Sequence, residues 1–95
     1  MDSVLNEAHG LVHKDRGEDY GHPFDDFSRT AKLWSVVLGT EVTPEQVALC
    51  MICVKLSREV NRPKRDNRVD IAGYAETLEM VHERRRANES GSLHD

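Results

Sequence analysis

The run VALCMICV at residues 47–54, directly preceded by TPEQ at residues 43–46, decides the fold. The TPEQ motif is typical of a helix start, because the hydroxyl of Thr43 can accept from the amide of Gln46 and the proline between them suits the first helical position. A helix that is apolar on every side is one that neighbouring elements surround. We therefore predict a central helix that begins at Thr43 and ends before Pro63, since the residue preceding a proline is biased away from helical angles.

Further helices are predicted on both sides of this central one. Apolar residues recur at helical steps of three and four in three other segments, residues 3–13, 23–38 and 66–87. Asp15 to Pro23 is a polar stretch with two glycines and is predicted as a loop. The sequence thus predicts an all-α fold, an antiparallel bundle of three longer helices and a short N-terminal helix. It forms one helical domain over residues 1–87, with a flexible C-terminal tail over residues 88–95.

The central helix also predicts self-association. Its three apolar faces need more partners than one small chain supplies, and burial of apolar surface contributes about 25 cal/mol per Å². A homo-oligomer, a dimer or a larger assembly, is therefore expected. Gly73 lies within the last predicted helix, where glycine costs about 1 kcal/mol relative to alanine, so a crossing helix or a ligand is expected to use the space beside it.

Composition narrows the class of protein. The chain has 95 residues, of which 38% are apolar, and a net charge of -4, which fits one folded domain. It contains no apolar run of the roughly 18 residues that cross a membrane, and its first residues do not resemble a signal peptide. We expect a cytoplasmic protein with no membrane partner. Its two thiols, Cys50 and Cys53, are expected to be reduced and packed in the core rather than redox-active.

Positive charge is concentrated in one segment of an acidic chain. Residues 55–70 hold six cations and three anions, whereas the remainder is acidic. Bulk nucleic-acid binding usually needs a broad basic face, so this pattern favours a small anionic ligand bound at one place and makes bulk nucleic acid an improbable partner. The alternative is a solvated helix end with no ligand.

The two helices that meet in this segment place their charges on facing sides. Helical steps of three and four align one set of candidate residues at the end of the central helix, Lys55, Arg58, Glu59 and Arg62. They align a second set on the next helix, Asp66, Asn67, Asp70 and Tyr74. A short turn makes the helices antiparallel, so we expect the two sets to meet with Asp70 opposite Lys55 or Arg58. The result is either a polar pocket or a structural salt-bridge lock.

The polar stretch before residue 23 supplies further candidates. Arg16 can pair with a phosphate, Tyr20 can stack on a base, and His22 titrates near neutral pH. The alternative is an ordered connector that caps the next helix. His9 and His13 are one turn apart, but zinc needs a third ligand and no carboxylate close in the sequence provides it.

Three stretches make the sequence resemble a known group of proteins. They are DYGHP at residues 19–23, KLSRE at residues 55–59 and DIAGY at residues 70–74. With them, the chain resembles small phage-encoded helical proteins that are similar to the MazG-like, all-α nucleoside triphosphate pyrophosphohydrolases. The resemblance covers about residues 12–82. It implies a helical oligomer that cleaves a nucleoside triphosphate to the monophosphate and pyrophosphate with Mg²⁺.

The acidic residues that hold the metal in that family are depleted here. The resemblance assigns Glu59 and Asp70 as catalytic and metal-binding, with Asp66 as a further metal ligand. Arg58 and Arg62 stand where the family has glutamates, and guanidinium groups favour phosphate over a metal ion. Two alternatives are therefore a protein that sequesters a nucleotide or cyclic nucleotide signal in phage counter-defence and a helical module that binds a host protein.

Overall fold

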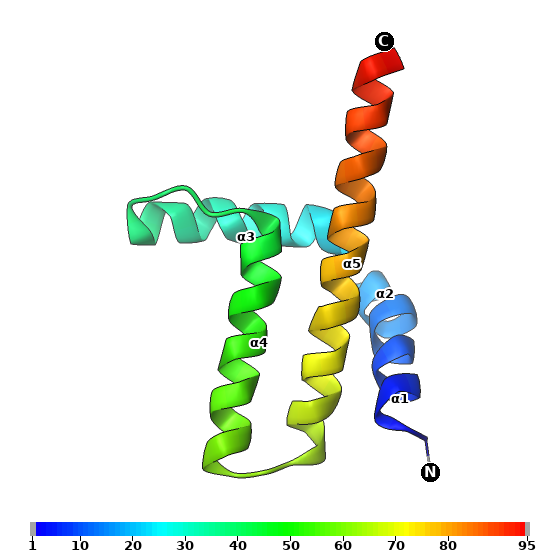
Figure 1. The fold of residues 1–95 in the computed structure, drawn as a ribbon, viewed down its shortest axis with the longest axis vertical. Coiled ribbons are helices and arrows are strands. Elements are labelled where there is room, and N and C mark those ends of the chain that lie inside the picture. The colour runs from blue at the N-terminus through cyan, green and yellow to red at the C-terminus, as the bar shows by residue number, and fades with distance from the viewer. Residues whose placement is uncertain (1, 95) are drawn as a thin grey trace.

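Helices α4 (Pro44–Asn61) and α5 (Arg65–His94) form an antiparallel hairpin that carries the rest of the chain (Figure 1). This computed structural model describes residues 2–94, and it describes side chains as far as residue 90. The predicted capping box is present at the start of α4. The N–H of Gln46 donates to the hydroxyl of Thr43, and the N–H of Thr43 donates to the side-chain carbonyl of Gln46.

Helix α5 is longer than the sequence predicted. It continues to His94, through the residues predicted as a flexible tail, and residue 95 lies outside the described part of the chain. No proline interrupts this stretch. Its asparagine, serines and glycine are weak helix formers, but each costs at most about 1 kcal/mol relative to alanine, so none of them forces the helix to end near residue 87. Beyond α3, α5 projects away from the other helices (Figure 1).

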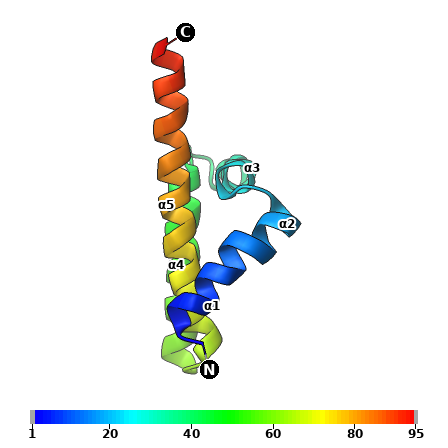
Figure 2. The same cartoon turned by 90° about the vertical axis from the view of Figure 1, so that its right-hand side faces the viewer.

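The N-terminal residues form one helical arm instead of a helix followed by a loop. Helix α1 (Val4–Gly10), the π-helical turn η1 (Leu11–Arg16) and α2 (Gly17–Tyr20) follow one another without a break. The predicted loop is therefore wrong over most of its length. Gly17 has φ -61° and ψ -36°, which any residue adopts in a helix, and only Gly21, with φ 77°, breaks the arm. The arm leans against α5 on the side away from α4 (Figures 1 and 2).

Helix α3 (Pro23–Leu38) crosses the hairpin steeply, so the predicted antiparallel bundle is wrong for this helix (Figures 1 and 2). Because α3 crosses at a steep angle, only a short part of it is buried against the hairpin, and the buried core lies at this crossing. It consists of residues from three helices, Phe27, Ala31, Val47, Ala48 and Val81, with Trp34 packed against them. The described residues 2–94 include no strand, and none of their helices has the length and apolarity needed to cross a membrane.

Gly73 lies where the N-terminal arm crosses α5. A methyl group built on Gly73 would lie 3.5 Å from Cγ2 of Val12, which is an ordinary van der Waals contact. A crossing helix therefore uses this space, as predicted, but leaves enough for alanine. We expect Gly73→Ala to raise the free energy of unfolding by about 0.5–1 kcal/mol in urea denaturation followed by circular dichroism. A clear loss of stability would show that the arm packs more closely than the structure indicates.

Candidate functional site

A surface basin of about 780 Å³ lies at the end of the hairpin where α4 turns into α5. Its lining includes six residues that the sequence predicted as a site, Lys55, Arg58, Arg62, Asp66, Asn67 and Asp70. Ser57, Asn61 and Lys64 complete it, and we call this set the hairpin basin. Four cations face two carboxylates, so the basin favours an anion. Its volume falls in the range of about 300–1,000 Å³ that small-molecule sites occupy.

Lys55 and Asp70 form the ion pair at the inner side of the hairpin basin. Nζ of Lys55 lies 2.9 Å from Oδ2 of Asp70, which confirms one of the two pairings predicted for Asp70. The Lys55 side chain is only 15% exposed, whereas that of Asp70 is 36% exposed. An ammonium group in such a position needs a negative partner, because an unpaired buried charge is costly. Lys55 is thus fixed in place and directed toward the space between the helices.

Arg58 and Arg62 are the available guanidinium groups of the hairpin basin. Both are exposed, and within the described part of the chain neither guanidinium has a hydrogen bond or ion pair. Their backbone positions are nevertheless fixed, since the N–H of Arg62 donates to the carbonyl of Arg58 at 2.9 Å and closes the last turn of α4. Two guanidinium groups one helical turn apart can each donate two parallel hydrogen bonds to phosphate oxygens.

Glu59 lies outside the basin and closes the turn between the two helices. Its carboxylate accepts from the N–H of Lys64 at 2.9 Å, from the amide of Asn67 at 3.3 Å and from the guanidinium of Arg68. The hydrogen bond from the Lys64 backbone, assisted by Arg68 and Asn67, holds the pKa of Glu59 below its usual value. The carboxylate of Glu59, which was predicted to be catalytic, thus joins the end of α4 to the start of α5. The side-chain amide of Asn67 is one of its hydrogen-bond donors.

The contacts of Glu59 and Asp70 determine whether these carboxylates could form the magnesium site that the resemblance implies. Over residues 2–94, the clusters of three potential metal ligands do not include one formed by Glu59, Asp66 and Asp70. Glu59 is held by three donors, and Asp70 is paired with Lys55. Mg²⁺ requires oxygen ligands arranged closely around it. The carboxylates present do not fit that requirement in this arrangement.

Arg16, Tyr20 and Tyr74 lie apart from the hairpin basin. The guanidinium of Arg16 donates to Asp26 at 2.6 Å and lies over the rings of Tyr20, Phe27 and Tyr74, at 4.9–5.9 Å from their centroids. Arg16 and Tyr74 line a cavity of about 130 Å³ between the arm and α5, which is too small for a nucleotide. These contacts stabilise the docking of the arm, and a role of the three residues in ligand binding stays a prediction.

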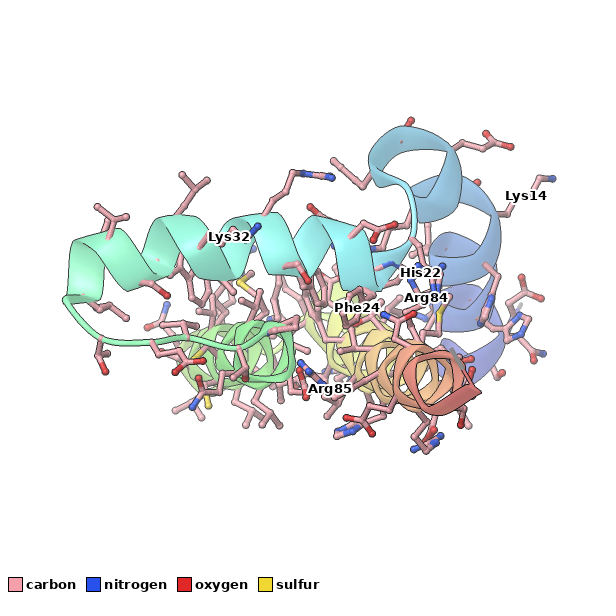
Figure 3. All side chains as sticks on the ribbon, turned by 90° about the horizontal axis from the view of Figure 1, so that it is seen from above. Lys14, His22, Phe24, Lys32, Arg84 and Arg85 are labelled. Atoms are coloured by element: carbon pink, nitrogen blue, oxygen red, sulfur yellow. The ribbon has the colours of Figure 1, made fainter. Side chains whose placement is uncertain are left out.

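His22 caps helix α3, which is the alternative that the sequence left open. The N–H of Phe24 donates to Nδ1 of His22 at 3.0 Å. Figure 3 shows His22 beside Arg84 at the start of α3. Partial burial, assisted by the positive charge of Arg84, holds the pKa of His22 below its usual value. The imidazole is therefore neutral in the folded chain at neutral pH and accepts the hydrogen bond.

The cap makes stability depend on pH. Because the pKa of His22 is lowered by folding, its contribution is complete above about pH 6.5 and is lost as the pH falls through the lower folded value. We expect His22→Asn, which retains a cap that does not titrate, to lose less stability than the wild type on acidification. Urea denaturation at several pH values between neutral and about pH 5 measures this. Parallel curves for the two proteins would contradict the assignment.

Comparison of the sequence with known proteins identifies the family to which the chain belongs. Residues 3–82 match a family described as a domain of unknown function, DUF6378. The chain belongs to the DUF6378 family. This DUF6378 domain is 39% identical over 83 residues to the Gene 55 protein of Mycobacterium phage D29, and 42% identical over 81 residues to that of Mycobacterium phage L5. No solved structure matches it.

These relatives confirm the phage-related part of the predicted resemblance and not the MazG-like part. The matches cover 86% and 83% of the DUF6378 chain, but only 55% and 52% of the relatives. The chain therefore spans about half the length of the curated relatives it matches. Neither the family description nor the relatives' names give an activity, so the nucleotide reading stays a prediction.

Two contacts of this DUF6378 domain were not predicted from its sequence. Arg85 donates two hydrogen bonds to Glu45, at 2.8 and 2.7 Å, and so joins α5 to the start of α4. Glu76 lies beside His13, and it supplies the third potential ligand that the sequence appeared to lack. Both pairs join residues far apart in the chain, and helical spacing reveals neighbours only within one helix.

Proposed function

We propose that this chain binds the phosphate groups of a nucleotide in the hairpin basin without hydrolysing it through a bound metal ion. The observation that carries the proposal is the pair of guanidinium groups of Arg58 and Arg62, which have no partner among the described residues, beside the fixed ammonium of Lys55. Guanidinium groups bind phosphate through charge-assisted hydrogen bonds, each about twice as strong as a neutral one. Three cations within one basin match a ligand that carries several phosphates.

The acidic residues of the basin favour a nucleotide over a simple anion. Asp66 is exposed at the basin and has no hydrogen bond or ion pair within the described residues. A carboxylate repels phosphate but accepts hydrogen bonds from hydroxyl and amino groups. A nucleotide could place its phosphates against Arg58 and Arg62 and its sugar or base against Asp66. Both the cations and the carboxylate would then have a hydrogen-bond partner.

Binding without turnover is favoured by the state of the carboxylates. Glu59 is held in the turn by Lys64, Asn67 and Arg68, so its use as a metal ligand would cost the lock between the helices. The phage origin of the relatives is compatible with a protein that removes a nucleotide signal from solution. This is the sequestration alternative that the sequence already raised.

Calorimetric titration with a nucleoside triphosphate tests the proposal. We expect binding in EDTA as well as in Mg²⁺, weaker binding at higher salt concentration, and no release of pyrophosphate. Inorganic triphosphate should bind too. Asp66→Asn removes a charge that repels phosphate, so it should raise the affinity for inorganic triphosphate more than that for the nucleotide, which also loses a charged hydrogen-bond acceptor for its sugar or base. Strict dependence on Mg²⁺ together with pyrophosphate release would replace sequestration with the hydrolytic reading.

We further propose that a second copy of the chain covers the exposed face of α4 and α3. In the single chain only Val47 and Ala48 of the central apolar run are buried, and large apolar residues are exposed on both helices, Leu33, Val36, Val37, Leu49, Leu56 and Val60. The accessible surface is 6536 Å². A compact monomer of this mass exposes about 5,500 Å², and the difference is close to the roughly 800 Å² that each partner of a stable dimer buries.

Replacement of Val60 tests this self-association. The side chain is 86% exposed, so Val60→Asp should leave the chain folded while it places a charge in the proposed contact. We expect sedimentation equilibrium to show a shift from dimer to monomer, with at least a tenfold weaker association. Leu5→Asp is the matched control, because Leu5 is also exposed but lies on α1. A wild-type protein that stays monomeric at high concentration would contradict the proposal.

A further inference from the structure

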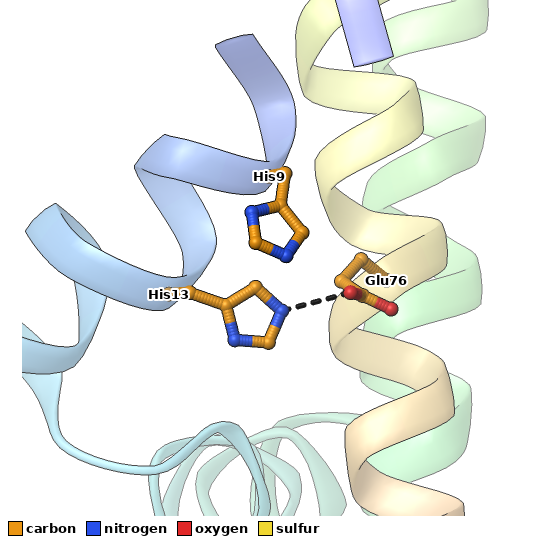
Figure 4. A group of neighbouring side chains, drawn as sticks. All are labelled: His9, His13 and Glu76. Atoms are coloured by element: carbon orange, nitrogen blue, oxygen red, sulfur yellow. Dashed lines mark hydrogen bonds and ion pairs between the residues drawn. The ribbon is translucent and has the colours of Figure 1, made fainter. Parts of the chain in front are cut away.

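A second cluster of chemically active side chains lies where the N-terminal arm crosses α5 (Figure 4). Nε2 of His13 lies 2.8 Å from Oε2 of Glu76. The rings of His9 and His13 lie with their centroids 4.3 Å apart and are tilted by 32° relative to one another. One potential ligand atom from each of these three residues lies within 4.8 Å of the other two, and no other such cluster occurs in the described part of the chain.

We propose that His9, His13 and Glu76 bind one divalent transition-metal ion of the zinc class. The donor set is two imidazole nitrogens and one carboxylate oxygen, which suits Zn²⁺ and its neighbours in the first transition row. Mg²⁺ and Ca²⁺ prefer oxygen ligands alone, so they do not match this set. The proposal is independent of the hairpin basin, because none of the three residues lines it.

The present geometry is close to what a tetrahedral ion needs. Zinc bonds of about 2.0–2.2 Å in tetrahedral directions place neighbouring donor atoms roughly 3.4 Å apart. The atoms already lie within 4.8 Å on partly exposed side chains, so rotation of these side chains, without helix movement, closes the difference. Nε2 of His13 and Oε2 of Glu76 are now joined by a hydrogen bond. In the metal-bound form the ion would replace the shared proton and bind both atoms.

Space for a fourth ligand is available next to the cluster. A groove of about 390 Å³ runs along α1 and α5, and both His9 and Glu76 line it. Water or a small ligand can therefore complete the coordination from the groove. Zinc sites with three protein ligands and one open position are the kind that activates a bound water.

The ion would join two parts of the chain that the sequence keeps far apart. His9 and His13 lie on the arm, around the start of the π-helical turn η1, and Glu76 lies in α5, 63 residues after His13. Such turns occur frequently at functional sites. Because metal binding would require the docked arm, it should stabilise the fold. The alternative is an ion pair between His13 and Glu76 alone, in which His9 has no part.

Cobalt titration of untagged protein distinguishes the two readings. Cys50 and Cys53 are exposed, so the prediction that they pack in the core is wrong. Because they could bind metal themselves, the experiment uses a Cys50→Ser, Cys53→Ser background. We expect one Co²⁺ per chain by visible absorption, displacement by Zn²⁺ and a higher melting temperature with either ion. His9→Ala should weaken binding at least tenfold. Since His9 is exposed and, among the described side chains, contacts His13 through its ring, the variant should remain folded. His13→Ala and Glu76→Gln should act in the same direction.

His82→Ala is the matched control, since His82 is an exposed histidine of α5 outside the cluster. Its metal affinity should equal that of the background protein. Unchanged affinity in His9→Ala would leave only the ion pair and overturn the proposal. Absence of binding at millimolar Co²⁺ and Zn²⁺ would overturn it as well. Neither result would affect the phosphate site, because nucleotide binding is measured in EDTA.

Discussion

Reversal of both arginine charges of the hairpin basin, Arg58→Glu with Arg62→Glu, should reduce nucleotide affinity at least 100-fold. A hydrogen bond to a charged group contributes about 1.5–3 kcal/mol, and loss of two such contacts corresponds to a factor of about 100 or more. The reversal also turns a lining of four cations and two carboxylates into one of two cations and four carboxylates. Phosphate would then meet repulsion. Calorimetry with a nucleoside triphosphate measures the loss.

The fold should survive this change, because both side chains are exposed and have no partner within the described residues. A matched control reverses two other exposed arginines, Arg29→Glu with Arg86→Glu, and alters the net charge by the same amount. Arg29 lies near Asp26 and Arg86 near Glu79, both outside the basin. Equal losses of affinity in the two double variants would mean that net charge, and not the basin, governs binding.

Phe27→Ala should destabilise the chain by about 3–5 kcal/mol, a large part of the stability of an ordinary domain. The side chain is 2% exposed and lies in the core where α3 crosses the hairpin. Its ring also contacts the guanidinium of Arg16 and the ring of Tyr74, so the docking of the arm is weakened together with that of α3. Urea denaturation followed by circular dichroism gives the difference in unfolding free energy.

Leu33→Ala provides the comparison on the same helix. Leu33 is 68% exposed, so its truncation in dilute protein should change the free energy of unfolding by less than about 0.5 kcal/mol. The hairpin basin involves neither residue, and the folded fraction of Phe27→Ala should keep its nucleotide affinity. Similar losses of stability in the two variants would show that the core does not lie where α3 crosses α4 and α5.

Local signals in the sequence predicted the helix ends well. The capping box at Thr43, the end of α4 before Pro63 and the end of α3 at Leu38, where Gly39 adopts a left-handed conformation, depend on a few adjacent residues, and the structure contains all three predicted features. Local signals were misleading for the polar stretch before residue 21, which was predicted as a loop but is helical. Polar composition and Gly17 suggest a loop, but charged residues extend a helix readily, and only the positive φ of Gly21 required a break.

Contacts between different helices were predicted correctly only where a short turn holds the two helices side by side. The pairing of Lys55 with Asp70 follows from two antiparallel helices joined by a few residues, and it was correct. The steep crossing of α3 and the approach of Glu76 to His13 depend on how separate helices pack, which no spacing within one helix shows. For Glu59 the sequence indicated a charged position near the turn, but not that the backbone of Lys64 would occupy its carboxylate.

The most direct test of the phosphate site is an amide chemical-shift map of the ¹⁵N-labelled chain during titration with a nucleoside triphosphate in EDTA. The account predicts that the largest shifts fall on residues 55–70, around the turn between α4 and α5, and that the helical arm at residues 4–20 changes little. Shifts concentrated on the arm and on Tyr74, or an unchanged spectrum at millimolar nucleotide, would contradict the assignment of the hairpin basin as the binding site.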